Sequence, residues 1–363
     1  MNQFYKVKAF AAVAVLVVVC GISANAQLAP GISVVASTVP GNGDVNPYGV
    51  ARVPETEGSL IRGNILVSNF NNSENLQGTG TTIVQIAPDG SSSLFAQIDP
   101  TTLPGPCPGG VGLTTALAVL RTGWVIVGSL PTTDGTSATV QAGCLLVLDS
   151  KGNVAETLYG SLINGPWDMA ALDMGSSAIL FVANVLNGTQ AAGGKQVHGG
   201  TVVRLTLNVT RASMPSLQSM TVIGSGFSEE TNPAALVIGP TGLGLSSDES
   251  LLYVADSLKN RIAAIPDPLF RNTSAGIGAT VSHGGGLNDP LGLAVDANGN
   301  ILATNGNNGF LVTITPDGNQ ISKQLLDNSG NPPGAGALFG LLPVAGQGLY
   351  YVDDASNTLN LFQ

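Results

Sequence analysis

The sequence feature that most constrains the fold is a repeat, clearest in the segment Gly239–Ile265, GPTGLGLSSDESLLYVADSLKNRIAAI. Its leucines alternate with glycines at the two-residue period of a β-strand, and a polar turn follows. The apolar run Leu251–Ala255 predicts a second strand that is buried on both faces and ends at Asp256. After another short turn, Arg261–Ile265 predicts a third strand. One copy of the repeat therefore forms three short neighbouring strands.

Five further segments follow the same plan. In every copy but one, the first strand has a small residue at one fixed position; in chain order these positions are Gly49, Ala116, Asp168 (the exception), Gly242, Gly292 and Gly340. They lie 67, 52, 74, 50 and 48 residues apart, a period typical of propeller blades. The sequence therefore predicts an all-β protein, a six-bladed β-propeller of four-stranded antiparallel blades, as one domain over residues 27–363.

The last copy of the repeat has no fourth strand, because the chain as given ends just after its third strand, Thr358–Phe362. An unassigned strand, Ile32–Val39, precedes the first copy. Pairing of these two segments would close the ring and cover an edge that otherwise promotes aggregation. We therefore predict that the N-terminal strand completes the last blade.

Residues 1–26 have the pattern of a bacterial export signal. Lys6 and Lys8 precede the apolar run 9–20, and Ala24-Asn25-Ala26 supplies the small residues of a cleavage site. The apolar run is too short to span a membrane. An alternative, lipid attachment at Cys20, is disfavoured by the valine before it. The protein is expected to be periplasmic or secreted.

Removal of this signal would leave Cys107 and Cys144 as the only cysteines. Cys107 lies in the loop that leads into the second blade, and Cys144 begins the third strand of that blade. The topology places both on one face of the blade, and an exported protein meets oxidising conditions. We predict a disulfide between them; the alternative is two buried thiols.

Charge excludes one class of partner. Residues 1–26 hold two of the 13 basic residues and no acidic ones, so 11 basic residues remain against 23 acidic residues, a formal charge of −12. Nucleic-acid binding needs a basic stripe, which is missing here. The partner is therefore expected to be an unidentified protein or small molecule, and the protein itself to be a monomer.

The segments Gly239–Ile265 and Asp289–Thr315 resemble NHL repeats, most closely in Leu252–Asp256 and Asn260–Ile262. This resemblance implies a six-bladed propeller, a fold shared with the SMP-30/gluconolactonase and strictosidine-synthase-like proteins. Those families include hydrolases, lyases and binding proteins, so the fold does not by itself decide the activity.

Polar residues are expected to gather at one face of the central channel, where first strands begin and second strands end. The candidates are Asn69, Ser129, Asn184, Asp256, Asn305 and Asp354 from the second strands, and Trp167, Asp168 and Thr241 from the first. Such oxygen ligands suit Ca²⁺, but Asn and Asp also commonly cap strand ends. Trp167 would either stack on a ligand or plug the channel.

The lactonase resemblance implies a channel Ca²⁺ held by a first-blade glutamate with later Asn and Asp residues, for which Asn184 and Asp256 are the metal candidates. The first blade opens with Asn46-Pro47-Tyr48-Gly49 and has no such glutamate. His198 and His283 are interpreted as loop residues rather than a metal pair, and no catalytic residue is assigned. The preferred function is an exported, non-enzymatic binding or interaction module; the alternative is a Ca²⁺-dependent lactonase or esterase-like hydrolase of the SMP-30/gluconolactonase type.

Overall fold

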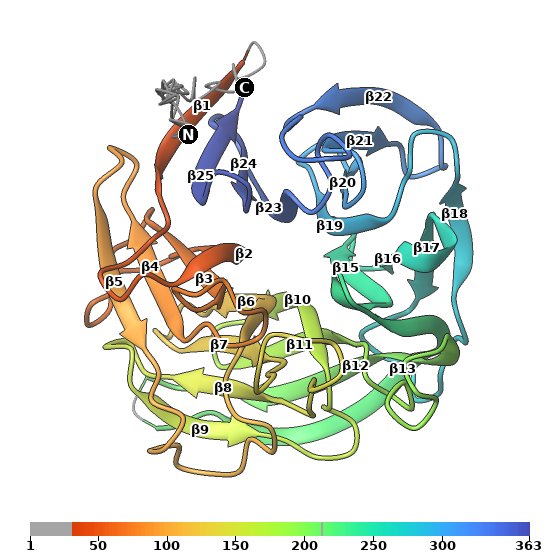
Figure 1. The fold of residues 1–363 in the computed structure, drawn as a ribbon. Helices are drawn as coiled ribbons and strands as arrows, with labels where there is room; N and C mark the ends of the chain where they lie inside the picture. Colours follow the sequence, from red (N-terminus) through yellow and green to blue (C-terminus); the bar gives the residue numbers. More distant parts are fainter. Residues whose placement is uncertain (1–30, 212) are drawn as a thin grey trace, which may run out of the picture.

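The computed structural model describes residues 31–211 and 213–363. They form six antiparallel sheets that surround a central axis as the blades of a propeller (Figure 1). The predicted all-β, six-bladed architecture is confirmed. Among the described residues the one helical segment is a single 3-10 turn, Ser257–Lys259.

In each blade the strands follow one another along the chain from the axis outward, except that the outermost strand of blade 6 is the N-terminal β1. Blade 1 contains β2 (Val45–Arg52), β3 (Ile65–Asn71), β4 (Thr82–Ile86) and β5 (Ser92–Gln97). Blade 2 contains β6 (Leu113–Val119), β7 (Val125–Ser129), β8 (Cys144–Leu148) and β9 (Val154–Leu158). Blade 3 contains β10 (Pro166–Asp173), β11 (Ser177–Asn184), β12 (Val197–Asn208), β13 (Ser216–Asn232) and β14 (Leu236–Ile238). Blade 4 contains β15 (Pro240–Leu245), β16 (Leu251–Asp256), β17 (Arg261–Pro266) and β18 (Ala279–His283). Blade 5 contains β19 (Pro290–Val295), β20 (Ile301–Asn305), β21 (Phe310–Ile314) and β22 (Gln320–Leu325). Blade 6 contains β23 (Leu338–Val344), β24 (Gly348–Asp353), β25 (Thr358–Phe362) and β1 (Ile32–Ser37).

The N-terminal strand closes the ring as predicted. β1 pairs antiparallel with β25, from Ile32 opposite Phe362 to Ser37 opposite Thr358. Figure 1 shows β1 as the outermost strand of blade 6, beside the C-terminus. The strand ends before the predicted Val39, because the backbone N–H and the hydroxyl of Thr38 both donate to the carbonyl of Asn357 in the turn before β25.

The predicted export signal, residues 1–26, lies outside the described residues. Within the described part of the chain, no helix has the length and apolar character needed to cross a membrane.

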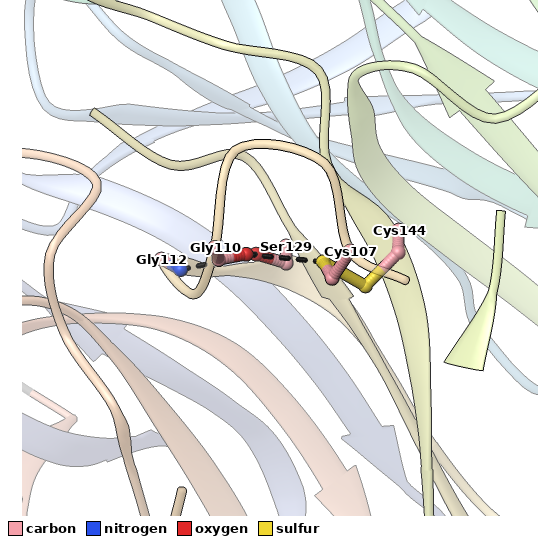
Figure 2. The surroundings of a disulfide bond; sticks show 5 residues. All are labelled: Cys107, Gly110, Gly112, Ser129 and Cys144. Atoms are coloured by element: carbon pink, nitrogen blue, oxygen red, sulfur yellow. Dashed lines mark hydrogen bonds between the residues drawn. A yellow bond between two sulfur atoms is a disulfide. The ribbon is translucent and has the colours of Figure 1, made fainter. Parts of the chain in front are cut away.

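The predicted disulfide between Cys107 and Cys144 is confirmed. The two Cα atoms are 5.1 Å apart, and the bond links the loop before β6 to the first residue of β8 (Figure 2). Ser129 holds the same loop, since its hydroxyl donates to the carbonyl of Gly110 and accepts the N–H of Gly112 (Figure 2). This long loop is therefore fastened to blade 2 at two points.

Blade 3 departs from the predicted four short strands. β12 begins at Val197, among several glycines, and β13 runs for 17 residues before pairing with the extra strand β14. Glycine normally weakens a strand, but here it is needed for close packing, because a Cβ at Gly200 would lie 2.7 Å from Cδ of Pro240 in blade 4.

Candidate active site

The upper end of the channel, where the first strands begin, is filled by an aromatic plug made of Tyr48, Phe70, Trp167 and Phe339. The ring of Tyr48 stacks on Phe339 and Phe70, with centroids 3.8 and 4.4 Å apart. Trp167 meets the edges of Tyr48 and Phe70 at 5.6 and 6.0 Å. All four side chains are buried. Of the two interpretations of Trp167, the structure therefore favours plugging the channel.

The predicted polar residues at this end hold loops. Asn69 donates to the carbonyl of Thr38 at 3.0 Å, and Ser129 fastens the loop before β6 as described above. Asn305 donates to the carbonyl of Gly286 at 2.8 Å and accepts the N–H of Asn288 at 3.0 Å. These side chains therefore cap strand ends.

Thr241 and Asp354 also lie at the upper end. The hydroxyl of Thr241 is buried and donates to the carbonyl of Pro290, which begins the first strand of the next blade, at 3.1 Å. Asp354 is half-buried, and burial together with the neighbouring Asp353 raises its pKa to about 7.

The residues present do not fit the calcium site implied by the lactonase resemblance. Asp256 is buried and accepts two N–H groups of Arg261 through one carboxylate oxygen, the shorter bond measuring 2.7 Å. Burial raises the pKa of Asp256, although Arg261 opposes that shift. Asn184 is buried, and its carbonyl oxygen accepts the N–H of Gly165 at 3.4 Å. Where the implied glutamate is missing, Tyr48 fills the axis instead.

No group of three His, Cys, Asp or Glu side chains among residues 31–211 and 213–363 is close enough to hold a metal ion. His198 and His283 are separate, and both are exposed. They lie on β12 and at the end of β18, so their interpretation as loop residues is wrong.

Below the plug, the channel widens into a cavity of about 330 Å³, here called the channel cavity. Aliphatic side chains from all six blades line it, among them Val50, Leu117, Met169, Leu245, Leu293 and Leu341. Each first strand pairs only with the second strand of its own blade. Its other edge therefore carries unpaired backbone N–H and C=O groups toward the axis, so the cavity wall is both aliphatic and hydrogen-bonding.

Asp168 also lines this cavity, at a bulge that recurs in all six first strands. The pairing register shifts between Pro166 and Met169 in β10, as it does at the corresponding point in the other blades. Four of those blades have glycine at the position of Asp168, because adjoining first strands approach closely; a Cβ at Gly242, for example, would lie 2.5 Å from the carbonyl oxygen of Leu291. At this level of the channel, blade 3 therefore places a carboxyl group where most other blades have no side chain.

Asp168 is a buried acid whose ionised form is only weakly stabilised by its surroundings. One carboxylate oxygen accepts the N–H of Leu243, on the first strand of blade 4, at 2.8 Å. Burial raises the pKa of Asp168 to about 7, and the hydrogen bonds from the backbone of Leu243 and Met169 only partly oppose this shift. The side chain remains 8% exposed, which agrees with its place in the cavity wall.

Of the predicted site residues, the structure thus places Asp168 in the cavity, Trp167 in the plug above it, and the strand-end residues outside it. The starts of the first strands pair with the ends of the second strands, so the strand-end residues lie at the upper end of the channel, whereas Asp168 lies below it. The aliphatic walls were missed, although one signal was present in the sequence: Asp168 was the single exception to the small-residue pattern.

Comparison with known proteins gives a match to a family model over part of the chain. Residues 194–330 match the model of the SMP-30/Gluconolactonase/LRE-like region. No curated protein matches the sequence. The family match covers the end of blade 3, blade 4 and blade 5, and it does not identify the NHL repeat.

Solved structures with the same fold extend the comparison to nearly the whole chain. A gluconolactonase from Xanthomonas campestris is 15% identical, with a TM-score of 0.52, over 89% of this chain and 87% of the other. Regucalcin from Agrobacterium tumefaciens, a calcium-binding protein, is 14% identical, with a TM-score of 0.56, over 90% and 92%. A luciferin-regenerating enzyme is 12% identical, with a TM-score of 0.53, over 90% and 93%. At these identities the likeness establishes the propeller fold.

The preferred prediction, a non-enzymatic binding module, is therefore corrected. The matching family model is named for gluconolactonase, and the similar structures include proteins described as enzymes. These findings favour the alternative, a lactonase-like hydrolase. The prediction took the missing first-blade glutamate as evidence against a hydrolase and placed the site among the polar residues of the upper end, several of which the structure shows to hold loops or, for Asp256, Arg261.

Proposed function

We propose that the protein is a lactonase-like hydrolase whose active site is the channel cavity, with Asp168 as the general base. The observation that carries the proposal is the carboxyl group of Asp168 in the wall of this cavity, with its pKa raised to about 7 by burial. A general base works best when its pKa lies near the working pH. The partial match to the gluconolactonase family model supports the reaction class.

In the proposed reaction, the Asp168 carboxylate removes a proton from a water molecule, whose oxygen attacks the carbonyl carbon of the lactone. The resulting oxyanion is stabilised by backbone N–H groups on the free edges of the first strands. The ring C–O bond then breaks, and the leaving oxygen takes the proton from Asp168. The product is a hydroxy acid, which ionises in water, and Asp168 returns to its starting state.

Calcium has no step in this proposal, because the candidate ligands do not fit it. Asp256 is neutralised by Arg261, and aromatic rings occupy the axis at the level where a channel ion would be held. The calcium-binding neighbour has the same fold, but at 14% identity it does not transfer its ligands to this chain.

The test is hydrolysis of δ-valerolactone in the presence of EDTA. The rate is measured as the rate at which base must be added to keep the pH constant. Asp168→Asn keeps an oxygen that can accept the Leu243 N–H but cannot take a proton, so the rate should fall by about 100- to 10,000-fold. Asp168→Gly, which copies the residue of four other blades, should be equally inactive. Full activity in folded Asp168→Asn, or no lactone hydrolysis by the wild type, would overturn the proposal.

We also propose that the protein acts as an exported monomer. The disulfide Cys107–Cys144 supports export, because such bonds persist in oxidising compartments. The NHL-like pattern of Gly239–Ile265 describes how blade 4 is built and adds nothing to the choice of substrate.

A further inference from the structure

We propose that the channel cavity selects ligands by charge: it admits uncharged or cationic molecules through the lower face and rejects anions. Applied to the proposed hydrolase, and resting on that function, the inference is that the substrate is an electroneutral lactone and that its carboxylate product is expelled.

The charge of the cavity comes from a single side chain. Asp168 is the one titratable residue in the wall, and no Lys, Arg or His among the described residues lines it. The buried cation at the upper end, Arg261, is already paired with Asp256 at 2.7 Å. The whole protein has a formal net charge of −10, which adds a weaker, long-range repulsion of anions.

The cavity opens at the lower face, where the first strands end. Along β10, Pro166 to Met169 are buried, whereas Ala171 is exposed. β15 and β19 likewise change from buried to half-buried residues toward their ends. The opposite end is shut by the aromatic plug. A ligand therefore reaches Asp168 from below, past Ala171.

Hydrolysis changes the fit of the ligand to this cavity. The neutral lactone can occupy the space beside the Asp168 carboxylate without repulsion. The product places a second negative charge in the same poorly solvated space, and no cation is present to balance it. At a separation of about 5 Å and an effective dielectric constant of about 20, this repulsion alone would lower affinity on the order of 100-fold. Because the pKa of Asp168 is about 7, uptake of a proton by Asp168 limits the loss to about tenfold at pH 8. The reaction should therefore show weak product inhibition.

The charge rule is tested without catalysis by calorimetric titration of the full mature protein at pH 8 with n-butylammonium and butyrate, which have the same alkyl chain. Wild-type protein should bind the ammonium ion about 100-fold more tightly. In Asp168→Asn the preference should fall to within a few-fold. Equal binding of the two ions by the wild type, or a preference that persists in the variant, would overturn the inference.

The entrance is tested by two matched substitutions on the lower face. Ala171→Trp places a large side chain at the mouth of the cavity and should abolish n-butylammonium binding. Ala297→Trp makes the same change at an exposed turn outside the cavity and should leave binding intact. Unchanged binding in Ala171→Trp would show that the ion reaches Asp168 by another route.

A pair of lactones separates this inference from the proposed function. γ-Valerolactone and 5-oxotetrahydrofuran-2-carboxylate share one ring, but the second carries a carboxylate in place of the methyl group. The inference predicts a kcat/KM about 100-fold lower for the anionic lactone. Equal hydrolysis of both lactones, with the activity still dependent on Asp168, would refute charge selection and leave the hydrolase proposal intact. Selective ammonium binding with no hydrolysis of either lactone would refute the hydrolase and leave charge selection intact.

Discussion

The two ends of the channel are built from the same six strands but behave as opposite kinds of structure. At the upper end the first strands present Tyr48, Trp167 and Phe339, whose rings pack into a closed plug. A few residues further along, the same strands present smaller aliphatic side chains, which leave a cavity of about 330 Å³. The size of the side chains at these two levels therefore decides which end of the channel is filled by packed core and which end contains a cavity.

The carboxyl groups at the two ends differ in the same way. At the upper end the Asp256 carboxylate is paired with Arg261, whereas Asp168 faces a cavity that a ligand can enter. Polar residues at the mouth of a propeller are thus a poor guide to its active site when each has a structural hydrogen bond. The more informative residue was the acid at a position where most other blades have glycine.

The largest expected effect tests whether the plug is core. Phe339→Ala removes a ring that is 7% exposed and stacked on Tyr48, and it should lower the free energy of unfolding by about 3–5 kcal/mol. Leu342→Ala, in the half-buried cavity wall, should cost about 1 kcal/mol. Urea unfolding of both variants measures the difference. Equal losses would mean that the two ends are packed alike.

Next comes the ion pair at the upper end. Arg261→Met leaves the Asp256 carboxylate buried without its partner, which should cost about 3 kcal/mol at pH 8. Because burial raises the pKa of Asp256, the loss should be smaller at pH 5, where the unpaired acid can take up a proton. Urea unfolding at both pH values tests this, and a loss independent of pH would mean that Asp256 stays charged.

An effect of similar size that depends on pH is expected for Asp168. Burial raises the pKa of Asp168 in the folded protein to about 7, above the ordinary value of 3.8, so its contribution to stability is fully present below about pH 4 and is lost as the pH rises through about 7. Asp168→Asn has no such loss and should exceed the wild type in stability by about 4 kcal/mol at pH 8, since one pKa unit corresponds to about 1.4 kcal/mol. At pH 4 the two proteins should be equally stable. Burial also raises the pKa of other acids, among them Glu229 and Asp289. These acids are the same in both proteins, so their effect on stability cancels in the comparison. Equal stability at pH 8 would indicate a pKa near the normal value.

The smallest expected effect is the response to calcium. Because Asp256 is paired with Arg261 and aromatic rings occupy the axis, 1 mM Ca²⁺ should shift the melting temperature by less than about 1 °C relative to EDTA. A differential scanning fluorimetry shift of several degrees that disappears in Asn184→Ala would contradict this assignment of the upper end.

Several features of the fold were predictable because their signals are local or topological. The strand pattern of Gly239–Ile265 predicts the antiparallel strands of one blade, and the recurrence of this pattern predicts a ring of blades. The absence of a fourth strand after Thr358–Phe362 led to the closure by β1, which the pairing of Ile32 with Phe362 confirms. The cysteine pair followed from the same topology.

The candidate site was only partly predictable. Asp168 was marked by an exception in the repeat, but its neighbours were not, because the cavity wall combines residues from six strands spaced about fifty positions apart. Which side chains meet at the axis depends on how each bulge turns its strand and on how closely the blades approach. The long β13 also depends on partners in β12 and β14.

By itself, the sequence determined the number of blades, the closure of the ring and the pairing of the two cysteines, because these follow from hydrophobic periodicity and chain connectivity. Only the tertiary structure decided that Tyr48, Trp167 and Phe339 shut one end of the channel and that Asp168 lies in an open cavity below them. Burial is a property of the assembled ring: the low polarity that raises the pKa of Asp168 to about 7 arises only when strands from every blade surround it.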